Sequence, residues 1–427
     1  MQKHIVVSSP KSAVKVKTVV TPRGLALWLV ESYAVPLVSL EFAIRGGSAQ
    51  DPTDKAGLGM LLAGLLDEGA GELDAQAFQR ALDEKAIEIS FHSDRDAMSG
   101  RMRTLTKNLD RAAELLRLAI NQPRFDEEPF IRVRENANAR LRHDANDPGS
   151  MAAKAWKAHA FPGHPYGQPT DGALDTLALI ERADLAAAAK RLLARDQLVV
   201  AVVGAIDEKS AGELVDRAFA DLPAKADLKP VAAAPFAGLG KIDAIPLDVP
   251  QSTIRFGRPG LMRDDPDYIA SVVAAHVLGG SGNMTSRLFR EVREKRGLAY
   301  TVFGNFYAYD HGAYYYGGTT TKNERARESF DVASHEIRDV ALKGLSEEEL
   351  EKGKTYLIGS YPLRFDTSVK IAAQLVHIQL EGRSPEWLVE RNLEIAAVTG
   401  ESLKRAAERA FGDGSLYTTV VGKPEGF

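Results

Sequence analysis

Two stretches, Leu198-Val-Val-Ala-Val-Val-Gly204 and Leu416-Tyr-Thr-Thr-Val-Val-Gly422, decide the fold of this chain of 427 residues. Each is an apolar, β-branched run that ends in glycine, a pattern typical of a buried strand. The second stretch begins 218 residues after the first. Another similar pair, Val35-Pro-Leu-Val-Ser-Leu-Glu-Phe42 and Val249-Pro-Gln-Ser-Thr-Ile-Arg-Phe256, is separated by 214 residues. Because the two offsets nearly agree, the sequence indicates an internal duplication of about 215 residues.

A linker separates the two halves. Residues 223–240 are dominated by proline, alanine and glycine, and they show no hydrophobic period. Such a composition predicts an extended connection. We therefore expect an N-terminal domain at 1–222, a linker at 223–247 and a C-terminal domain at 248–427.

Strands and helices mix within each half without strict alternation. The patterns predict strands at 25–31, 37–45, 87–93 and 97–105, and helices at 56–66, 74–84, 109–121 and 127–142. In the second half they predict a strand pair at 299–309 and 312–321, joined by a turn at Asp310-His-Gly312. Strand pairs followed by long helices favour an antiparallel α+β sandwich over a doubly wound parallel sheet.

Composition and charge exclude some classes of protein. The formal net charge of −4 is spread along the chain, and no basic stripe indicates nucleic-acid binding. No apolar run approaches the ~18 residues that a membrane span needs. There is no cysteine, so a metal would need His, Asp or Glu ligands. Residues 1–10 lack the apolar core of a signal peptide, which favours the cytoplasm, or the periplasm if an export signal has been removed.

Three further segments carry residues of chemical interest. Gly57-Leu-Gly-Met-Leu-Leu-Ala-Gly-Leu-Leu66 has the apolar spacing of a helix. Arg293-Glu-Lys-Arg-Gly-Leu-Ala-Tyr300 places an arginine and a tyrosine seven residues apart. On spacing alone, the arginine belongs to a charged, solvated helix face and the tyrosine is a half-buried strand residue. Leu278-Gly-Gly-Ser-Gly-Asn-Met284 is glycine-rich, and its simplest interpretation is a turn between helices.

With these segments the chain resembles the pitrilysin family of inverted zinc peptidases, which includes mitochondrial processing peptidase and insulin-degrading enzyme. The resemblance covers almost the whole chain. It rests on Arg45-Gly-Gly-Ser-Ala-Gln-Asp-Pro52, Gly57-Leu58, Gly69, His164-Pro-Tyr-Gly167, Gly279-Gly-Ser-Gly282, Ser286-Arg-Leu-Phe289, Arg293 and Leu298-Ala-Tyr300. It implies an α+β fold with two homologous antiparallel α/β sandwich domains that form a clamshell, like LuxS and mitochondrial processing peptidase.

The chain departs from the active members of this family at the zinc site. Those members carry His-x-x-Glu-His on the first-half helix and a third ligand, a glutamate, about 75 residues later. Here Met60 and Gly64 replace the histidines, and Ala63 replaces the glutamate that activates water. The third-ligand region 139–141 reads Ala-Arg-Leu. The resemblance therefore implies that this chain holds no zinc and is inactive alone.

The arginine and tyrosine of the second half, Arg293 and Tyr300, are kept as in active members of the family. In active relatives the tyrosine hydroxyl can donate to the oxyanion, and the arginine can hold a substrate carbonyl or orient the tyrosine. A lost zinc site beside a kept pair resembles the non-catalytic subunit of a bacterial two-subunit peptidase. The resemblance thus implies a heterodimer in which a homologous partner carries zinc, this chain lends Arg293 and Tyr300, and both enclose a peptide. Gly279, Gly280 and Gly282 occupy the position of a glycine-rich substrate loop.

Two alternatives stay open at this point. The chain could be an inert peptide-binding or structural scaffold of the same fold, like the core subunits of respiratory complexes. It could also be a homodimeric enzyme with an unrecognised site. Of the nine histidines, the nearest pair, His159 and His164, is expected to pack or to cap, and His92 with Asp94 and His143 with Asp144 are only weak candidates for surface metal contacts.

Overall fold

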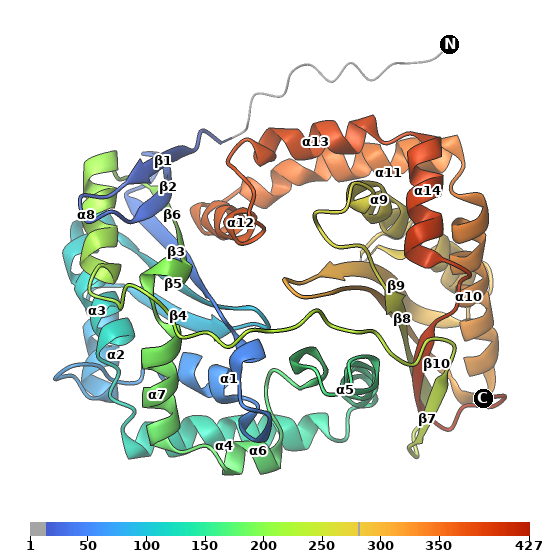
Figure 1. Ribbon diagram of the computed structural model, residues 1–427, viewed down its shortest axis with the longest axis horizontal. Helices are drawn as coiled ribbons and strands as arrows, with labels where there is room; N and C mark the ends of the chain where they lie inside the picture. The colour runs from blue at the N-terminus through green and yellow to red at the C-terminus, as the bar shows by residue number, and fades with distance from the viewer. Residues whose placement is uncertain (1–13, 281) are drawn as a thin grey trace. The chain divides into compact units, whose positions relative to one another are not determined.

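A computed structural model describes residues 14–280 and 282–427, so the N-terminal segment used for the export argument lies outside the described residues, as does Ser281 (Figure 1). The chain forms two compact units. Unit 1 contains the described residues up to Glu135, together with Thr176–Lys229 and Ser360–Leu393. Unit 2 contains Asn136–Asp175, Pro230–Gly359 and Glu394–Phe427.

The units do not follow the halves of the sequence. A segment of the first half packs in unit 2, and a segment of the second half packs in unit 1. The boundaries at 222 and 248 therefore remain a proposal about the repeat, whereas the units describe how the chain packs.

Unit 1 is built on a mixed sheet of six strands. The order across the sheet is β1 (Lys17–Val20), β2 (Ala26–Glu31), β6 (Leu198–Gly204), β3 (Leu37–Arg45), β5 (Ala97–Leu105) and β4 (Glu88–Ser93). Every neighbouring pair is antiparallel except β2 and β6, which are parallel.

Helices cover both faces of this sheet (Figure 1). On one side α3 packs against β5 and α8, and on the other α12 packs on β3 and β6. Strand β3 is therefore buried along almost its whole length. The helices of unit 1 include α1 (Leu58–Ala63), α2 (Ala75–Asp83), α3 (Leu109–Asn121), α7 (Arg182–Leu192), α8 (Glu208–Phe219) and α12 (Ser368–Leu380).

Unit 2 is built on a mixed sheet of five strands. The order is β7 (Ile242–Pro246), β11 (Tyr417–Gly422), β8 (Gln251–Pro259), β10 (Ala313–Lys322) and β9 (Ala299–Ala308). Only β7 and β11 run parallel. Helix α5 packs on β11 and β8, while α9, α10 and α14 share the hydrophobic core. The main helices are α5 (Pro148–Ala160), α9 (Tyr268–Gly279), α10 (Ala326–Lys343), α11 (Glu347–Ser360) and α14 (Gly400–Phe411).

Four of the described helices cross the unit boundaries in the sequence. They are α4 (Glu127–Asp144), α6 (Leu174–Ala178), α13 (Trp387–Ala397) and, by its last residue alone, α11.

The α+β architecture with two sheet domains is confirmed, with two local differences. We expected antiparallel sheets, but each sheet contains one parallel pair. In unit 1 the parallel strands are β2 and β6, which a long crossover connects, and in unit 2 they are β7 and the last strand, β11. The helix expected at 56–66 is shorter, Leu58–Ala63, because Gly57 enters it at φ 96° and Gly64 ends it. The hairpin at 310–312 is confirmed by a bond from Tyr309 N to Gly312 O of 2.9 Å.

No helix within residues 14–280 and 282–427 has both the length and the apolar character needed to cross a membrane.

Candidate functional site

Helix α1, in unit 1, keeps the packing of the expected zinc helix. Leu58, Leu61 and Leu62 are buried, which matches the predicted apolar face. The Asp51 carboxylate holds the start of the helix by accepting hydrogen bonds from the Gly57 and Gly59 amides at 3.0 Å. Burial raises the pKa of Asp51 to about 7 despite these donors.

The side chains of α1 do not fit a zinc ion. Ala63 and Gly64 carry no ligand atom, and Met60 offers only a thioether. A Cβ at Gly64 would lie 3.3 Å from Cγ1 of Val133, so an aliphatic side chain fills the space beside it. Among residues 14–280 and 282–427, no group of three or more His, Asp or Glu side chains could hold a metal ion. The residues of α1 at positions 60, 63 and 64 therefore offer a zinc ion no histidine or carboxylate ligand.

Arg293, in unit 2, lies in a π-helical segment, η6 (Phe289–Glu294), and not in the regular helix that its charged neighbours indicate. The wider turn shows in bonds from Lys295 N to Arg290 O at 2.9 Å and from Leu298 N to Val292 O at 2.8 Å. Single π-turns occur often at functional sites. The backbone therefore departs from regular α-helical geometry at Arg293, the residue that the family resemblance selects.

Tyr300 lies at a β-bulge. Thr320 of β10 is paired with Thr301, but the next residue, Thr321, is paired with Ala299, so Tyr300 is the extra residue. Without the bulge, Tyr300 would share the core face with Val302, which is only 9% exposed. Instead its side chain is 76% exposed, which corrects the expectation of a half-buried strand residue. Bulges commonly re-aim a side chain next to a functional site.

The two residues meet. The guanidinium carbon of Arg293 lies 4.3 Å from the centroid of the Tyr300 ring and 4.8 Å from that of Phe289. Both distances lie within the range of cation–π attraction. The half-buried arginine is therefore stacked between two rings, and one of them carries an exposed phenol.

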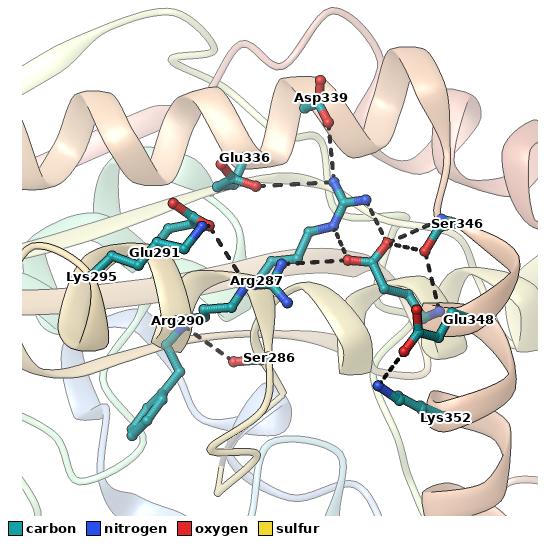
Figure 2. Close-up of polar contacts among 12 residues, drawn as sticks. Ser286, Arg287, Arg290, Glu291, Lys295, Glu336, Asp339, Ser346, Glu348 and Lys352 are labelled. Atoms are coloured by element: carbon teal, nitrogen blue, oxygen red, sulfur yellow. Dashed lines mark hydrogen bonds and ion pairs between the residues drawn. The ribbon is translucent and has the colours of Figure 1, made fainter.

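An ion-pair cluster anchors the segment that carries Arg293 (Figure 2). Arg287 makes a bidentate pair with Glu349, with both distances 2.7 Å, and a third bond to Asp339 at 3.1 Å. Arg287 lowers the pKa of Glu349 to about 2, whereas burial raises the pKa of neighbouring Glu336. Although Arg287 lies in the same charged run as Arg293, it is not on a solvated face, because its side chain is only 12% exposed.

The other basic residues of the segment also have acidic partners. Glu291 lies 2.6 Å from Lys295 and 2.7 Å from Arg296, and Arg290 lies 3.6 Å from Glu349. Arg293 has no carboxylate within 4.0 Å among the residues that the structure describes. Its charge is therefore not offset by an ion pair with any of the described residues.

The glycine-rich segment 278–284 contains two glycines that are closely packed, Gly279 and Gly280, and one that is exposed, Gly282. A Cβ on Gly279 would lie 2.6 Å from Leu288, and one on Gly280 would lie 2.7 Å from the His276 ring. Both glycines are thus explained by close packing at the end of α9. Gly282 has φ 75° and open space around it. The proposed substrate-loop role of Gly279, Gly280 and Gly282 stays a prediction.

Of the two histidines expected to pack or to cap, His159 has a side chain that is 60% exposed, whereas His164 caps a short 3₁₀ turn. His164 is buried, its Nδ1 accepts from Tyr166 N at 3.1 Å, and its Nε2 lies 2.9 Å from Ala232 O. The partners of Arg287, by contrast, were missed by sequence reasoning. They lie 52 and 62 residues away, on α10 and α11, so no local pattern reveals them.

The described residues thus combine two α+β units, a first-half helix without histidine or carboxylate at positions 60, 63 and 64, and an Arg/Tyr pair, a combination that defines a peptidase-like fold. Residues 29–173 match the family described as Insulinase (Peptidase family M16), and residues 179–357 match the Peptidase M16 inactive domain. The chain belongs to the M16 peptidase family, of which the pitrilysin group is a part.

Similar proteins carry both peptidase and non-peptidase names. The chain is 27% identical to "Non-peptidase homolog YmxG" of Helicobacter pylori, over 79% of this chain and 78% of that protein. It is 26% identical to "Uncharacterized zinc protease SCO5738" of Streptomyces coelicolor, over 86% and 81%. The crystal structure of a peptidase M16 inactive domain from Pseudomonas fluorescens superposes with a TM-score of 0.89 at 23% identity, covering 96% of this chain and 98% of that one. That likeness supports the fold.

Proposed function

We propose that this chain is the non-catalytic subunit of a heterodimeric zinc metallopeptidase. It helps a homologous, zinc-bearing partner to enclose a peptide, and it supplies Arg293 and Tyr300 to the partner's active site. One observation carries the proposal: Arg293, without a carboxylate partner among the described residues, is stacked on the exposed Tyr300 by a π-turn and a bulge. Both backbone features recur beside functional sites in proteins.

The chemistry of the pair fits peptide hydrolysis. Attack on a peptide carbonyl places negative charge on its oxygen, and an exposed phenol can donate a hydrogen bond to that oxygen. A guanidinium can hold a neighbouring carbonyl through its fork of N–H donors. The ion pairs of Arg287 and Glu291 fix the segment, so the donors are positioned before substrate arrives.

The zinc would belong to the partner. The donor set on α1 does not fit a metal, and no step of hydrolysis is assigned to this chain's own helix. The name of the Helicobacter pylori relative, a non-peptidase homolog, supports a role without independent activity.

The alternative is an inert peptide-binding or structural scaffold. A scaffold explains the loss of metal ligands equally well. It gives no reason for an exposed tyrosine at a bulge beside an arginine that lacks an acidic partner within 4.0 Å in the described part of the chain. The Arg/Tyr pair therefore favours the subunit proposal.

Co-expression with a homologous chain that carries His-x-x-Glu-His tests the proposal. We expect a stable heterodimer whose peptidase turnover exceeds that of the partner alone. Metal analysis of the separated chains should find zinc with the partner only. A partner that is equally active with and without this chain would leave the scaffold as the better account.

A further inference from the structure

Two threonines lie on the core face of strand β10. Thr319 is 1% exposed and Thr321 is 2% exposed. The residues packed on this side of the sheet are mainly apolar, among them Ala299, Val302 and Phe330. Valine has nearly the shape of threonine and would pack there with no polar group to satisfy. The two hydroxyl groups therefore need an explanation beyond packing.

Their hydrogen bonds supply one, because each hydroxyl donates to a backbone carbonyl close to Tyr300. Thr319 Oγ1 lies 3.1 Å from the carbonyl oxygen of Thr301, the residue after Tyr300. Thr321 Oγ1 lies 2.5 Å from the carbonyl oxygen of Leu298, two residues before Tyr300. Both bonds therefore reach the neighbouring chain at the bulge, where the regular ladder is interrupted and backbone groups need other partners.

Leu298 connects the bulge to the π-turn. Its amide donates to the carbonyl of Val292 at 2.8 Å, while its carbonyl accepts from Thr321. Val292 directly precedes Arg293. The hydroxyl of Thr321 therefore holds the segment of backbone that joins Arg293 to Tyr300.

Helix α10 supports this arrangement from the core side of β10. Oγ of the buried Ser329, on α10, lies 3.5 Å from Thr319 Oγ1. The same helix carries Asp339, which accepts a hydrogen bond from Arg287 in the segment of Arg293 (Figure 2). One helix thus contacts a residue that holds the bulge and a residue that anchors the π-turn.

We propose that Thr319 and Thr321 are positioning residues that fix the bulge at Tyr300. They keep its phenol exposed beside Arg293. The proposal deepens the proposed function and rests on it in one respect, that the Arg/Tyr pair meets a substrate. Without the two hydroxyls, the bulge can shift along β9 and the Tyr300 ring can turn toward the core face of the sheet.

Nitration of the isolated full-length chain by tetranitromethane tests the proposal, because the reagent modifies exposed phenols and peptide mass spectrometry reports Tyr300 separately. Tyr33 of unit 1, which is 63% exposed, serves as the reference within each sample. Thr321→Val should slow the nitration of Tyr300 about twofold or more relative to Tyr33, since losing a buried hydrogen bond shifts a two-state balance by about tenfold. Thr321→Ser keeps the hydroxyl and should be nitrated like the wild type.

Thr419→Val is the matched control. Thr419 is fully buried in β11 of the same sheet, and its hydroxyl donates to the Tyr417 oxygen at 3.3 Å, so this variant loses a buried bond away from the site. It should leave the nitration of Tyr300 unchanged. Equal rates in Thr321→Val and the wild type, or equal slowing in Thr321→Ser or Thr419→Val, would overturn the proposal. If Thr321→Val does not fold, Thr319→Val takes its place with the same expectation.

Kinetics of the assembled heterodimer show whether the threonines act through the proposed pair. Thr319→Val should lower kcat and leave KM nearly unchanged, because its bond lies on the Tyr300 side only. Thr321→Val should also raise KM, because Leu298 is tied to the turn that holds Arg293.

A double variant makes this test sharper. Thr319→Val combined with Tyr300→Phe should turn over no more slowly than Tyr300→Phe alone, because the phenol hydroxyl that Thr319 positions is already absent. Additive losses would mean that Thr319 supports the fold and not Tyr300, which contradicts the proposal. The nitration rates need no partner chain. They can therefore support the positioning role when co-expression gives no active heterodimer, and they can overturn it when the heterodimer is active.

Discussion

The guanidinium carbon of Arg293 lies 4.3 Å from the centroid of the Tyr300 ring, although one residue belongs to a π-turn and the other to a strand. The arginine therefore has two proposed contributions: it positions the Tyr300 ring, and its own guanidinium contacts the substrate. Kinetics of the assembled complex can separate these two contributions.

Tyr300→Phe should lower the turnover of the heterodimer by about 10²–10³-fold while leaving assembly and zinc content intact. The change removes one hydroxyl and almost no volume, and the ring that stacks on Arg293 is kept. Steady-state kinetics with a fluorogenic peptide provide the measurement. Wild-type turnover would mean that the hydroxyl does not meet the reacting oxygen.

Arg293→Ala should raise KM as well as lower kcat, because an arginine that holds a carbonyl acts in the ground state too. Arg293→Lys keeps the charge but loses the planar fork, so it should restore only part of the binding. Tyr300→Phe should instead lower kcat and leave KM nearly unchanged. Unchanged KM in both arginine variants would leave Arg293 without a substrate role.

The isolated chain should bind no zinc tightly and should hydrolyse no peptide. Met60, Ala63 and Gly64 offer no histidine or carboxylate, and Val133 fills the space next to Gly64. Atomic emission analysis after dialysis against a weak chelator is the measurement. One equivalent of zinc retained per chain, and lost on mutation of α1, would contradict this expectation.

Arg287→Met should destabilise unit 2 by about 3–5 kcal/mol, since it leaves Glu349 and Asp339 without their buried cation. Urea unfolding followed by circular dichroism measures the loss. The matched control is Arg325→Met, which breaks a surface pair with Glu328 and should barely move the midpoint. A similar small shift in both variants would mean that the Arg287 cluster is solvated in solution.

Glu41→Gln should flatten the pH dependence of unit 1 stability. Burial raises the pKa of Glu41 from 4.5 to about 7, even though Arg101 Nε lies 2.8 Å from its carboxylate. The folded state then holds this proton more tightly than the unfolded state. The free energy of unfolding should therefore fall by about 3 kcal/mol as pH rises from about 4.5 to about 7.

Thermal unfolding between pH 5 and pH 8 checks the sign, with Glu88→Gln, an exposed residue paired with Arg103, as control. If the wild-type chain is instead most stable at the higher pH and Glu41→Gln follows it, burial does not dominate at Glu41.

Much of the fold follows from the sequence, because the strands are regular and periodic. Strands β3 and β5 begin and end where the alternation predicts, and the repeat of β6 in β11 correctly indicates two related sheets. The bounds of the short α1 were harder to predict, since the left-handed Gly57 delays its start and Gly64 ends it. Hydrophobic alternation along the sequence thus predicts the bounds of regular strands well.

The candidate site was less predictable for a physical reason. Family motifs select Arg293 and Tyr300, but their geometry depends on a π-turn and a bulge that periodicity does not encode. The burial of Arg287 depends on acids from two distant helices. The amino-acid composition of residues 287–296 is the same whether Arg287 is buried or lies on a solvated helix face, so it cannot predict the burial.

The exchange of helices between the halves has a consequence for synthesis. Helix α12, made near the end of the chain, packs on β3 and β6, which are made in the first half. On the ribosome, that face of the early sheet therefore waits, apolar and uncovered, until residue 380 has emerged. A premature stop before α12 would therefore leave unit 1 without part of its core as well as truncating unit 2.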